Sequence, residues 1–322
     1  MHTLSDAQQQ HLDAVDGRWA EYAPLIRRQR ELAGGLQWKT ISGHEYLYRY
    51  APDPITKVKR STSLGRKSPE TEAFYSDFLA EREKVQHRLQ ELEPEIEAMA
   101  RMSKALRLGR VRESIVDLLR TVWAEGQAEH LVLSGMAVLP AYEHRSRVVV
   151  GTLPELKPIE LFVGVVDIDE VIDQVEATLR RSDKTYRYHG QGVFAGAKGP
   201  DVRLTAPSTV SSMLDGWEAE QEAIDMVLET MLDEPVSSLV MAKSGNVAPV
   251  LAIQPTAWLA LALCRAYYDK SLDQDEYEAL VALAIEMSAL STRMGFQISH
   301  DLSKMEFMAP LFGDDGGRPM RI

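Results

Sequence analysis

The sequence predicts an α+β fold, in which a mixed-sheet core is flanked by N-terminal and C-terminal helical regions. Up to Gly126, apolar residues recur mainly at helical spacing. From there to Pro207, short runs rich in β-branched residues alternate with two helical stretches, and afterwards helical spacing dominates again. The predicted regions are an N-terminal helical region (1–126) with a short strand near 45–50, a core (127–207) and a mainly helical C-terminal region (208–322).

The N-terminal region is predicted to contain helices at both of its ends. Residues 6–33 carry apolar side chains at helical spacing and end at a Gly-Gly pair, and a further helix covers about 110–125. Between them, "HEYLYRYA" alternates and is aromatic, which is typical of a short strand. The stretch "PDPITKVKRSTSLGRK" that follows is predicted to be a basic loop.

A long helix is predicted over 69–108. Ser68 is placed to cap it, and Pro69 suits its first position. Pro94 either kinks this helix or begins a second one. Its apolar positions keep near-heptad spacing, so it either packs on its own domain as an amphipathic helix or forms a dimer contact.

The core and the C-terminal region contain the predicted strands. Helices are expected at about 135–143 and 168–182. The strand-like runs are "HLVLS", "RVVVGT", "IELFVGVV", "GVFAGA", "DVRLTA", "SSLVMA" and "APVLAIQ". The most apolar window, "VAPVLAIQPTAWLALALC", is broken by Gln254-Pro255, so it predicts a strand followed by a buried helix and no membrane span.

Composition bounds the protein class. With 322 residues, 45% apolar and 26% charged, the chain is typical of a soluble globular protein with a sizeable core. A net charge of −12 argues against broad non-specific nucleic-acid binding but leaves room for a local basic patch. The single cysteine, Cys264, excludes a disulfide framework, and the N-terminus lacks a secretory leader, so we expect a cytoplasmic protein.

Several stretches carry a resemblance. "GHEYLYRYAPDPITKVKRSTSLGRKSPETEAFYSDF" resembles the N-terminal signature of a bacterial nucleotidyltransferase-like family: a Tyr-Leu-Tyr strand, a basic loop, then Ser-Leu-Gly-x-x-Ser-Pro-Glu-Thr-Glu and a helix. "LVLSGMAVLPAYE" is similar to the strand-turn-helix that opens the catalytic core of that family. Weaker likenesses lie in "LRRSDKTY", "GPDVRLTAP" and "IQPTAWLALAL", so the resemblance covers residues 44–268.

The resemblance implies a polymerase-β-like nucleotidyltransferase core. Such folds transfer a nucleoside monophosphate from a nucleoside triphosphate to an acceptor with two metal ions, so Mg²⁺ is expected only if the chain is active. Divalent ions of this kind need carboxylate ligands. Residues i and i+2 of a strand share a face, so an Asp-x-Asp or Asp-x-Glu strand presents two of them, and a neighbouring strand supplies a third.

Two acidic motifs compete for this role. Asp167-Ile168-Asp169 precedes a helical pattern, so Asp167 is predicted to cap that helix with Glu170, and the two aspartates are expected to diverge. Pro158-Ile159-Glu160 opens the apolar strand "IELFVGVV" at the spacing from Ser134-Gly135 that the family shows. The resemblance therefore assigns the acidic pair to Pro158 and Glu160, of which only Glu160 can bind metal.

The third acid of the family falls on Arg203, with Asp201 two residues before it. A guanidinium group works against binding two divalent cations, so the site is predicted to be degenerate, with Glu160 and Asp201 as its remnant. Arg203 is expected on the strand next to Glu160, forming an ion pair with it. The opposite hypothesis is an active enzyme whose unusual metal site uses Glu160, Asp201 and Asp167 or Asp169.

Other residues are candidates for nucleotide or phosphate binding, each with a plainer alternative. Ser134-Gly135 contacts phosphate or is only a strand-to-helix turn. Asp183-Lys184 is a remnant of nucleotide binding or a helix-end ion pair. The basic residues before the long helix bind an anion or RNA, or form a solvated loop; they are Lys57, Lys59, Arg66 and Lys67.

Three functions stay open at this point. The first is a nucleotidyltransferase-fold protein without transfer activity that binds a nucleotide, RNA or a protein partner. The second is an active, metal-dependent nucleotidyltransferase with an unknown acceptor. The third is a structural scaffold whose 69–108 helix contacts a protein partner or a second copy of the chain. None of them involves a membrane.

Overall fold

The structure is a computed structural model that describes residues 1–52, 59–151, 156, 158–165 and 168–312. The chain forms two compact units. The core unit is Met1–Gln9 and Arg107–Ile322, and the hairpin unit is Gln10–Leu106. Three regions with boundaries at 126 and 207 were expected, and neither position separates compact units.

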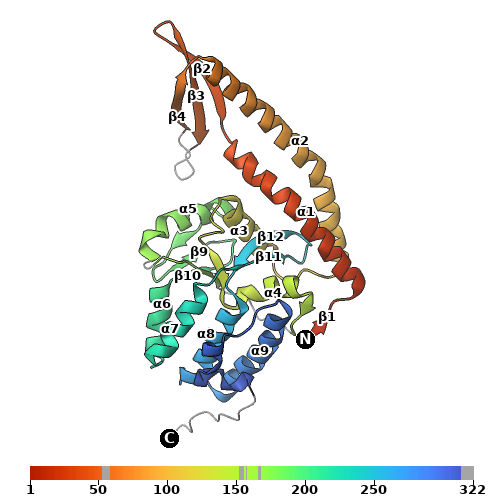
Figure 1. Cartoon of the computed structure of the whole chain (residues 1–322), viewed down its shortest axis with the longest axis vertical. Helices are drawn as coiled ribbons and strands as arrows, with labels where there is room; N and C mark the ends of the chain where they lie inside the picture. The colour runs from red at the N-terminus through yellow and green to blue at the C-terminus, as the bar shows by residue number, and fades with distance from the viewer. Residues whose placement is uncertain (53–58, 152–155, 157, 166–167, 313–322) are drawn as a thin grey trace. The chain divides into compact units, whose positions relative to one another are not determined.

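The hairpin unit consists of two long helices joined by a small sheet (Figure 1). The helices are α1 (Asp6–Glu31) and α2 (Pro69–Ala105). The antiparallel sheet has the order β2 (Gly35–Ile41), β3 (His44–Pro52) and β4 (Lys59–Arg66). Only the middle strand was predicted, and the predicted basic loop contains β4, because the polar run of β4 carries no apolar alternation.

Helix α2 begins as predicted. The backbone N–H of Thr71 donates to Ser68 Oγ (3.3 Å), and the N–H of Ser68 donates to Thr71 Oγ1 (2.9 Å), with Pro69 as the first helical residue. The helix continues as one element through Pro94 to Ala105. This pair of reciprocal bonds satisfies N–H groups that a helix start leaves open.

An apolar stripe holds α1 and α2 together. Its buried cluster contains Phe78, Val85 and Leu89 of α2 and Leu32 just after α1, with tyrosine, leucine and isoleucine of α1 packed around it. The amphipathic reading of the long helix is therefore confirmed: its apolar side packs within its own unit. Whether α2 also contacts another chain stays a prediction.

The core unit is built on a seven-stranded mixed sheet (Figure 1). Its strand order is β11-β12-β5-β7-β10-β9-β8. The bounds are β5 (Val132–Ser134), β7 (Ile159–Phe162), β8 (Arg187–Tyr188), β9 (Val193–Ala195), β10 (Val202–Thr205), β11 (Val236–Met241) and β12 (Val247–Ala252). Because β11 and β12 join this sheet, the core extends beyond the predicted limit at 207. The mixed helix-and-sheet class itself is confirmed.

Helices cover both faces of the sheet, with α3 and α5 on one side and α6–α9 on the other (Figure 1). Their bounds are α3 (Glu113–Ala124), α4 (Leu139–Ser146), α5 (Ile172–Ser182), α6 (Pro207–Gly216), α7 (Gln221–Met231), α8 (Pro255–Tyr268), α9 (Gln274–Arg293) and α10 (His300–Ser303). Short 3₁₀ helices are η1 (Gly135–Val138), η2 (Ile168–Glu170) and η3 (Glu306–Leu311). Residues 69–125 contain α2, α3 and no strand, as predicted, and Val111 forms an isolated bridge with Ala242.

One local prediction changes in the core unit. The run "RVVVGT" supplies only β6 (Val148–Val149), which pairs with β1 (His2–Thr3) outside the large sheet. Cys264 is fully buried in α8, as its apolar surroundings predicted. No helix in the described part of the chain is long and apolar enough to cross a membrane.

Candidate functional site

The candidate site begins where β5 ends, at a turn that requires glycine. Gly135 has a φ of +58° and is the first residue of η1. A Cβ atom at this position would lie 2.5 Å from Glu160 Oε2, so the absent side chain makes room for the carboxylate. The carbonyl of Gly135 accepts a hydrogen bond from Trp258 Nε1 of α8 (3.1 Å). The turn is thus held between β7 and α8.

Three side chains of different chemistry line up across adjacent strands. In the antiparallel pair β5–β7, Ser134 lies opposite Glu160. In the parallel pair β7–β10, Arg203 lies opposite Glu160. Residues directly opposite each other share a face of a sheet, so a hydroxyl, a carboxyl and a guanidinium group lie in one row. The prediction that Arg203 lies on the strand next to Glu160 is therefore confirmed.

Burial dominates the ionisation of Glu160. Removal from water raises the pKa of this carboxyl, and the charges of Arg203 and Arg265 oppose the rise without cancelling it. Arg265 belongs to α8, two turns after Trp258. The neutral form of this carboxyl is therefore favoured more than in an exposed glutamate.

The expected ion pair between Glu160 and Arg203 is absent among the described residues. The Glu160 carboxylate lies against Gly135, which follows β5. Arg203 belongs to β10, the strand that flanks β7 on the edge opposite to β5, and is exposed. Arg203 therefore presents its guanidinium to solvent. This part of the prediction is wrong: the carboxylate lies beside Gly135, where the absence of a side chain leaves room for it.

Two hydroxyl groups beside this row lack hydrogen-bond partners. Ser134 is 2% exposed, and its Oγ is buried without a partner in the described structure. Thr205 Oγ1 is also buried without a partner; Thr205 lies two residues after Arg203, on the same face of β10. Most buried polar atoms are satisfied, so these two hydroxyls are exceptions beside the row.

The residues present do not fit a pair of metal ions. Pro158 precedes β7 and offers no side-chain oxygen, and Arg203 brings a positive charge to the row. Asp201 lies just before β10 and is exposed; its backbone carbonyl accepts from the N–H of Ile159 (2.8 Å). Across the described residues, no group of three or more His, Cys, Asp and Glu could hold a metal.

Asp183 organises a loop and forms no pair with Lys184. Its carboxylate accepts from the backbone N–H of Thr185 (2.9 Å) and of Lys198 (2.9 Å). Backbone and hydroxyl hydrogen bonds from Thr185 lower the pKa of Asp183 to about 2. Lys184 is exposed, and it contributes its carbonyl to a bond from Arg187 (3.0 Å). The predicted ion pair is therefore wrong.

The predicted acidic pair at 167–169 is placed only in part. Asp167 lies outside the described residues, and Asp169 belongs to the 3₁₀ turn η2. Helix α5 begins at Ile172 with Val171 as its N-cap and without a side-chain capping bond. The helix therefore starts later than the predicted capping pair requires, and Asp169 lies on no strand.

The basic candidates belong to the hairpin unit. Arg66 Nη2 bonds to His44 Nδ1 (2.8 Å). Lys67 Nζ pairs with Glu45 (2.7 Å) and lies 5.5 Å from the centre of the Trp38 ring. Lys57 and the side chain of Lys59 lie outside the described residues. These cations belong to the hairpin unit, whereas the row at Glu160 belongs to the core unit.

Sequence reasoning missed Trp258 and Arg265. Their seven-residue separation places both on one face of α8. Arg265 Nε also bonds to Asp269 Oδ2 (3.2 Å), and its guanidinium lies 5.9 Å from the centre of the Trp217 ring. A tryptophan and an arginine seven residues apart in a strongly apolar helix are the signal that could have found them.

Comparisons with known family models, curated proteins and solved structures give no match to the chain.

Proposed function

We propose that the core unit is a nucleotidyltransferase-like domain with a degenerate metal site, which binds the phosphate groups of a nucleotide without a divalent cation. The observation that carries this proposal is the position of Arg203 directly opposite Glu160, in the row that begins at Ser134. In an active enzyme of the resembled family this row would hold carboxylates for metal ions. In this chain Arg203, which stays positively charged, occupies that position.

The chemistry of the row suits an anion better than a metal. Arg203 is exposed and forms no ion pair with any described residue, so its fork of N–H donors is free for phosphate oxygens. The hydroxyls of Ser134 and Thr205 are buried beside this row, so Arg203 is the group of the row that is exposed to a phosphate. Glu160 has a raised pKa and therefore opposes an anion less than an ordinary carboxylate would.

Calorimetry with ATP, CTP, GTP and UTP tests this function, each titrated with Mg²⁺ and with a chelator. The expected result is binding that the chelator leaves unchanged. Arg203→Ala should weaken it by about 1.5–3 kcal/mol, the usual contribution of hydrogen bonds to charged groups. The matched control is Arg145→Ala, an exposed arginine of α4 away from the row, which should bind like the parent.

The other outcomes discriminate between functions. Binding that requires Mg²⁺, together with release of pyrophosphate, would support an active metal-dependent enzyme and overturn the proposal. Absence of nucleotide binding under all conditions would favour a scaffold role. An equal loss in Arg203→Ala and Arg145→Ala would show that the phosphate attraction is general rather than local to this row.

A further inference from the structure

The small sheet of the hairpin unit has two faces of different character. Residues at alternate positions of a strand point to opposite faces. Leu36, Trp38 and Leu47 share the inner face: Leu47 is 0% exposed, Leu36 packs on the buried cluster, and Trp38 contacts Tyr75 of α2 with ring centres 6.0 Å apart. The inner face therefore binds the sheet to the helices.

The outer face carries a row of three tyrosines. Tyr46, Tyr48 and Tyr50 alternate along β3, the central strand, so their rings follow one another on the same side. All three are half-buried, and no ring contact in the described structure links them to α1 or α2. Ser63 and Ser61 of β4 lie opposite Tyr48 and Tyr50 and add exposed hydroxyls.

Cations flank this row without acidic partners. Lys39 Nζ lies 5.0 Å and 5.1 Å from the ring centres of Tyr48 and Tyr50. Arg66 lies opposite Tyr46 in the register and bonds to His44. Neither Lys39 nor Arg66 forms an ion pair with a carboxylate of the described chain, whereas Lys67 is held by Glu45 and Glu72. Lys39 interacts with the Tyr50 hydroxyl and Arg66 bonds to His44, so both cations have neutral partners and keep their charge for an anion.

The charge of this segment is opposite to that of the rest of the chain. Residues 35–68 contain seven Lys and Arg against two Asp and Glu, which gives +5. The whole chain carries −12, so the remaining residues carry −17. An acidic protein that concentrates positive charge around an aromatic sheet is built to attract a polyanion at that place and repel it elsewhere.

We propose that this outer face, defined by Lys39, Tyr46, Tyr48, Tyr50 and Arg66, binds single-stranded nucleic acid. Aromatic side chains on a positively charged surface accept bases by stacking, with little preference for sequence. Alternate residues of a strand are separated by ~6.6 Å, whereas stacked nucleotides of a duplex advance by ~3.4 Å. Successive rings therefore suit bases that are unstacked, as in a single strand.

Fluorescence anisotropy with the full-length chain tests the proposal. The probes are a labelled single-stranded RNA and DNA of the same sequence, the corresponding duplex, and polyglutamate as competitor. We expect both single strands to bind more tightly than the duplex, with an affinity that falls as salt rises from ~50 to ~200 mM. The RNA and DNA arms show whether the 2′-hydroxyl contributes.

Matched variants separate stacking from charge. Tyr48→Ala should weaken single-strand binding about tenfold or more, because a base loses its stacking partner, while Tyr48→Phe should keep it. Lys39→Gln should lower the slope of log affinity against log salt by ~1. Lys104→Gln, an exposed lysine at the far end of α2, is the control and should leave both quantities unchanged.

Three results would overturn the proposal. One is equal binding of duplex and single strand. Another is a loss in Tyr48→Phe as large as in Tyr48→Ala, since a ring is then not the recognition element. The third is displacement by polyglutamate at the same charge concentration, which would indicate an acidic protein as partner. Arg203→Ala should leave the anisotropy unchanged, so this test is independent of the nucleotide site in the core unit.

Discussion

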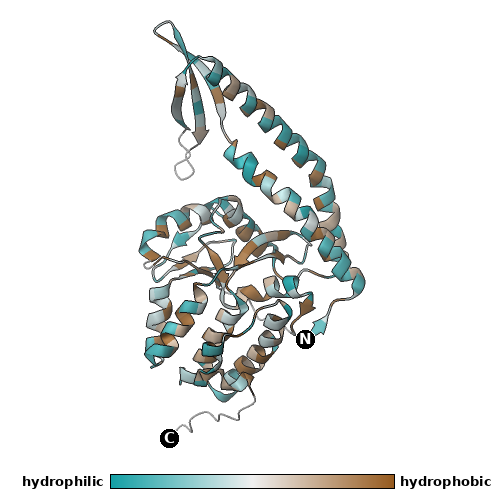
Figure 2. Ribbon diagram, viewed as in Figure 1, coloured by the Kyte–Doolittle hydropathy of each residue, from teal (hydrophilic) through white to brown (hydrophobic). Residues whose placement is uncertain are grey.

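The two units of this chain are held together in different ways. The core unit is held by one large apolar cluster that reaches from α3 to η3, and its strands and α8 are strongly hydrophobic (Figure 2). The hairpin unit has a narrow apolar stripe, and its two helices are largely hydrophilic on the remaining surface (Figure 2). In the first unit burial holds the fold, whereas in the second ion pairs supplement a small core.

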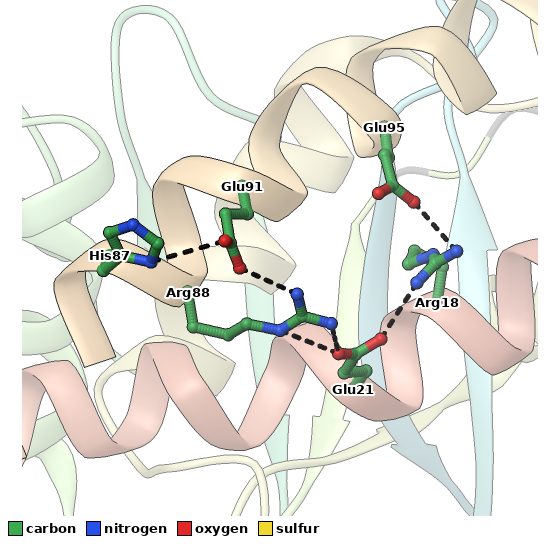
Figure 3. Close-up of polar contacts among 6 residues, drawn as sticks. All are labelled: Arg18, Glu21, His87, Arg88, Glu91 and Glu95. Atoms are coloured by element: carbon green, nitrogen blue, oxygen red, sulfur yellow. Dashed lines mark hydrogen bonds and ion pairs between the residues drawn. The ribbon is translucent and has the colours of Figure 1, made fainter. Parts of the chain in front are cut away.

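Figure 3 shows the ion pairs that join α1 to α2. Arg88 bonds to Glu21 of the facing helix (3.0 Å from Nε) and to Glu91 of its own (2.8 Å). Arg18 likewise connects Glu21 (3.0 Å) and Glu95 (2.8 Å). The ion pairs of Arg18 and Arg88 thus connect the two helices, whereas Lys39 and Arg66 of the sheet form no ion pair with a described carboxylate.

The comparison predicts the largest loss of stability from a core-unit truncation. Leu161 lies in β7, is 0% exposed, and belongs to the main cluster. Leu161→Ala should lower the free energy of unfolding by about 2–5 kcal/mol, measured by urea denaturation of the full chain. Leu232→Ala, at a leucine that is 57% exposed, is the control and should stay within about 0.5 kcal/mol of the parent.

A smaller loss is expected at Gly135, where backbone and packing costs can be separated. Gly135→Ala places a side chain at positive φ, which costs about 1–2 kcal/mol. It also collides with Glu160, which adds about 1–3 kcal/mol. In a Glu160→Ala background only the first cost should remain. Additive effects in this double-mutant cycle would contradict the observed contact.

Burial of Glu160 predicts that the stability of the protein depends on pH. Its folded-state pKa is raised by burial, so its contribution to stability is present at low pH and is lost as pH rises from 4.5 through the folded value. Glu160→Gln should therefore gain stability relative to the parent as pH increases, seen in thermal melts. It should also strengthen nucleotide binding by removing a charge beside Arg203. Weaker binding in this variant would instead favour a metal ligand.

The smallest effect is expected from the ion pairs of the hairpin unit. Glu21→Gln removes the carboxylate shared by Arg88 and Arg18, and all three side chains are solvent-exposed or half-buried. Because water and salt screen such pairs, the loss should be slight at low salt and should vanish at high salt. Hydrogen exchange of α2 amides at both salt concentrations measures it, and a salt-independent loss would show that the network is not electrostatic.

Local chemistry in the sequence determined the helices well. Ser68 and Pro69 mark the start of α2 because capping depends on neighbours within one turn. The buried position of Cys264 follows from the apolar run around it. The strand that carries Glu160 was equally readable, because a short β-branched run between turns has few alternatives.

The tertiary structure alone decided which of these elements meet and where their side chains point. The polar strand β4 exists because β3 supplies its hydrogen-bond partners, and β11 and β12 extend the sheet by pairing next to β5. The register placed Arg203 beside Glu160 as expected, but the carboxylate lies beside Gly135 and forms no ion pair with Arg203. Capping and periodicity act over a few neighbouring residues, whereas pairing, cavities and side-chain direction depend on segments far apart in the chain.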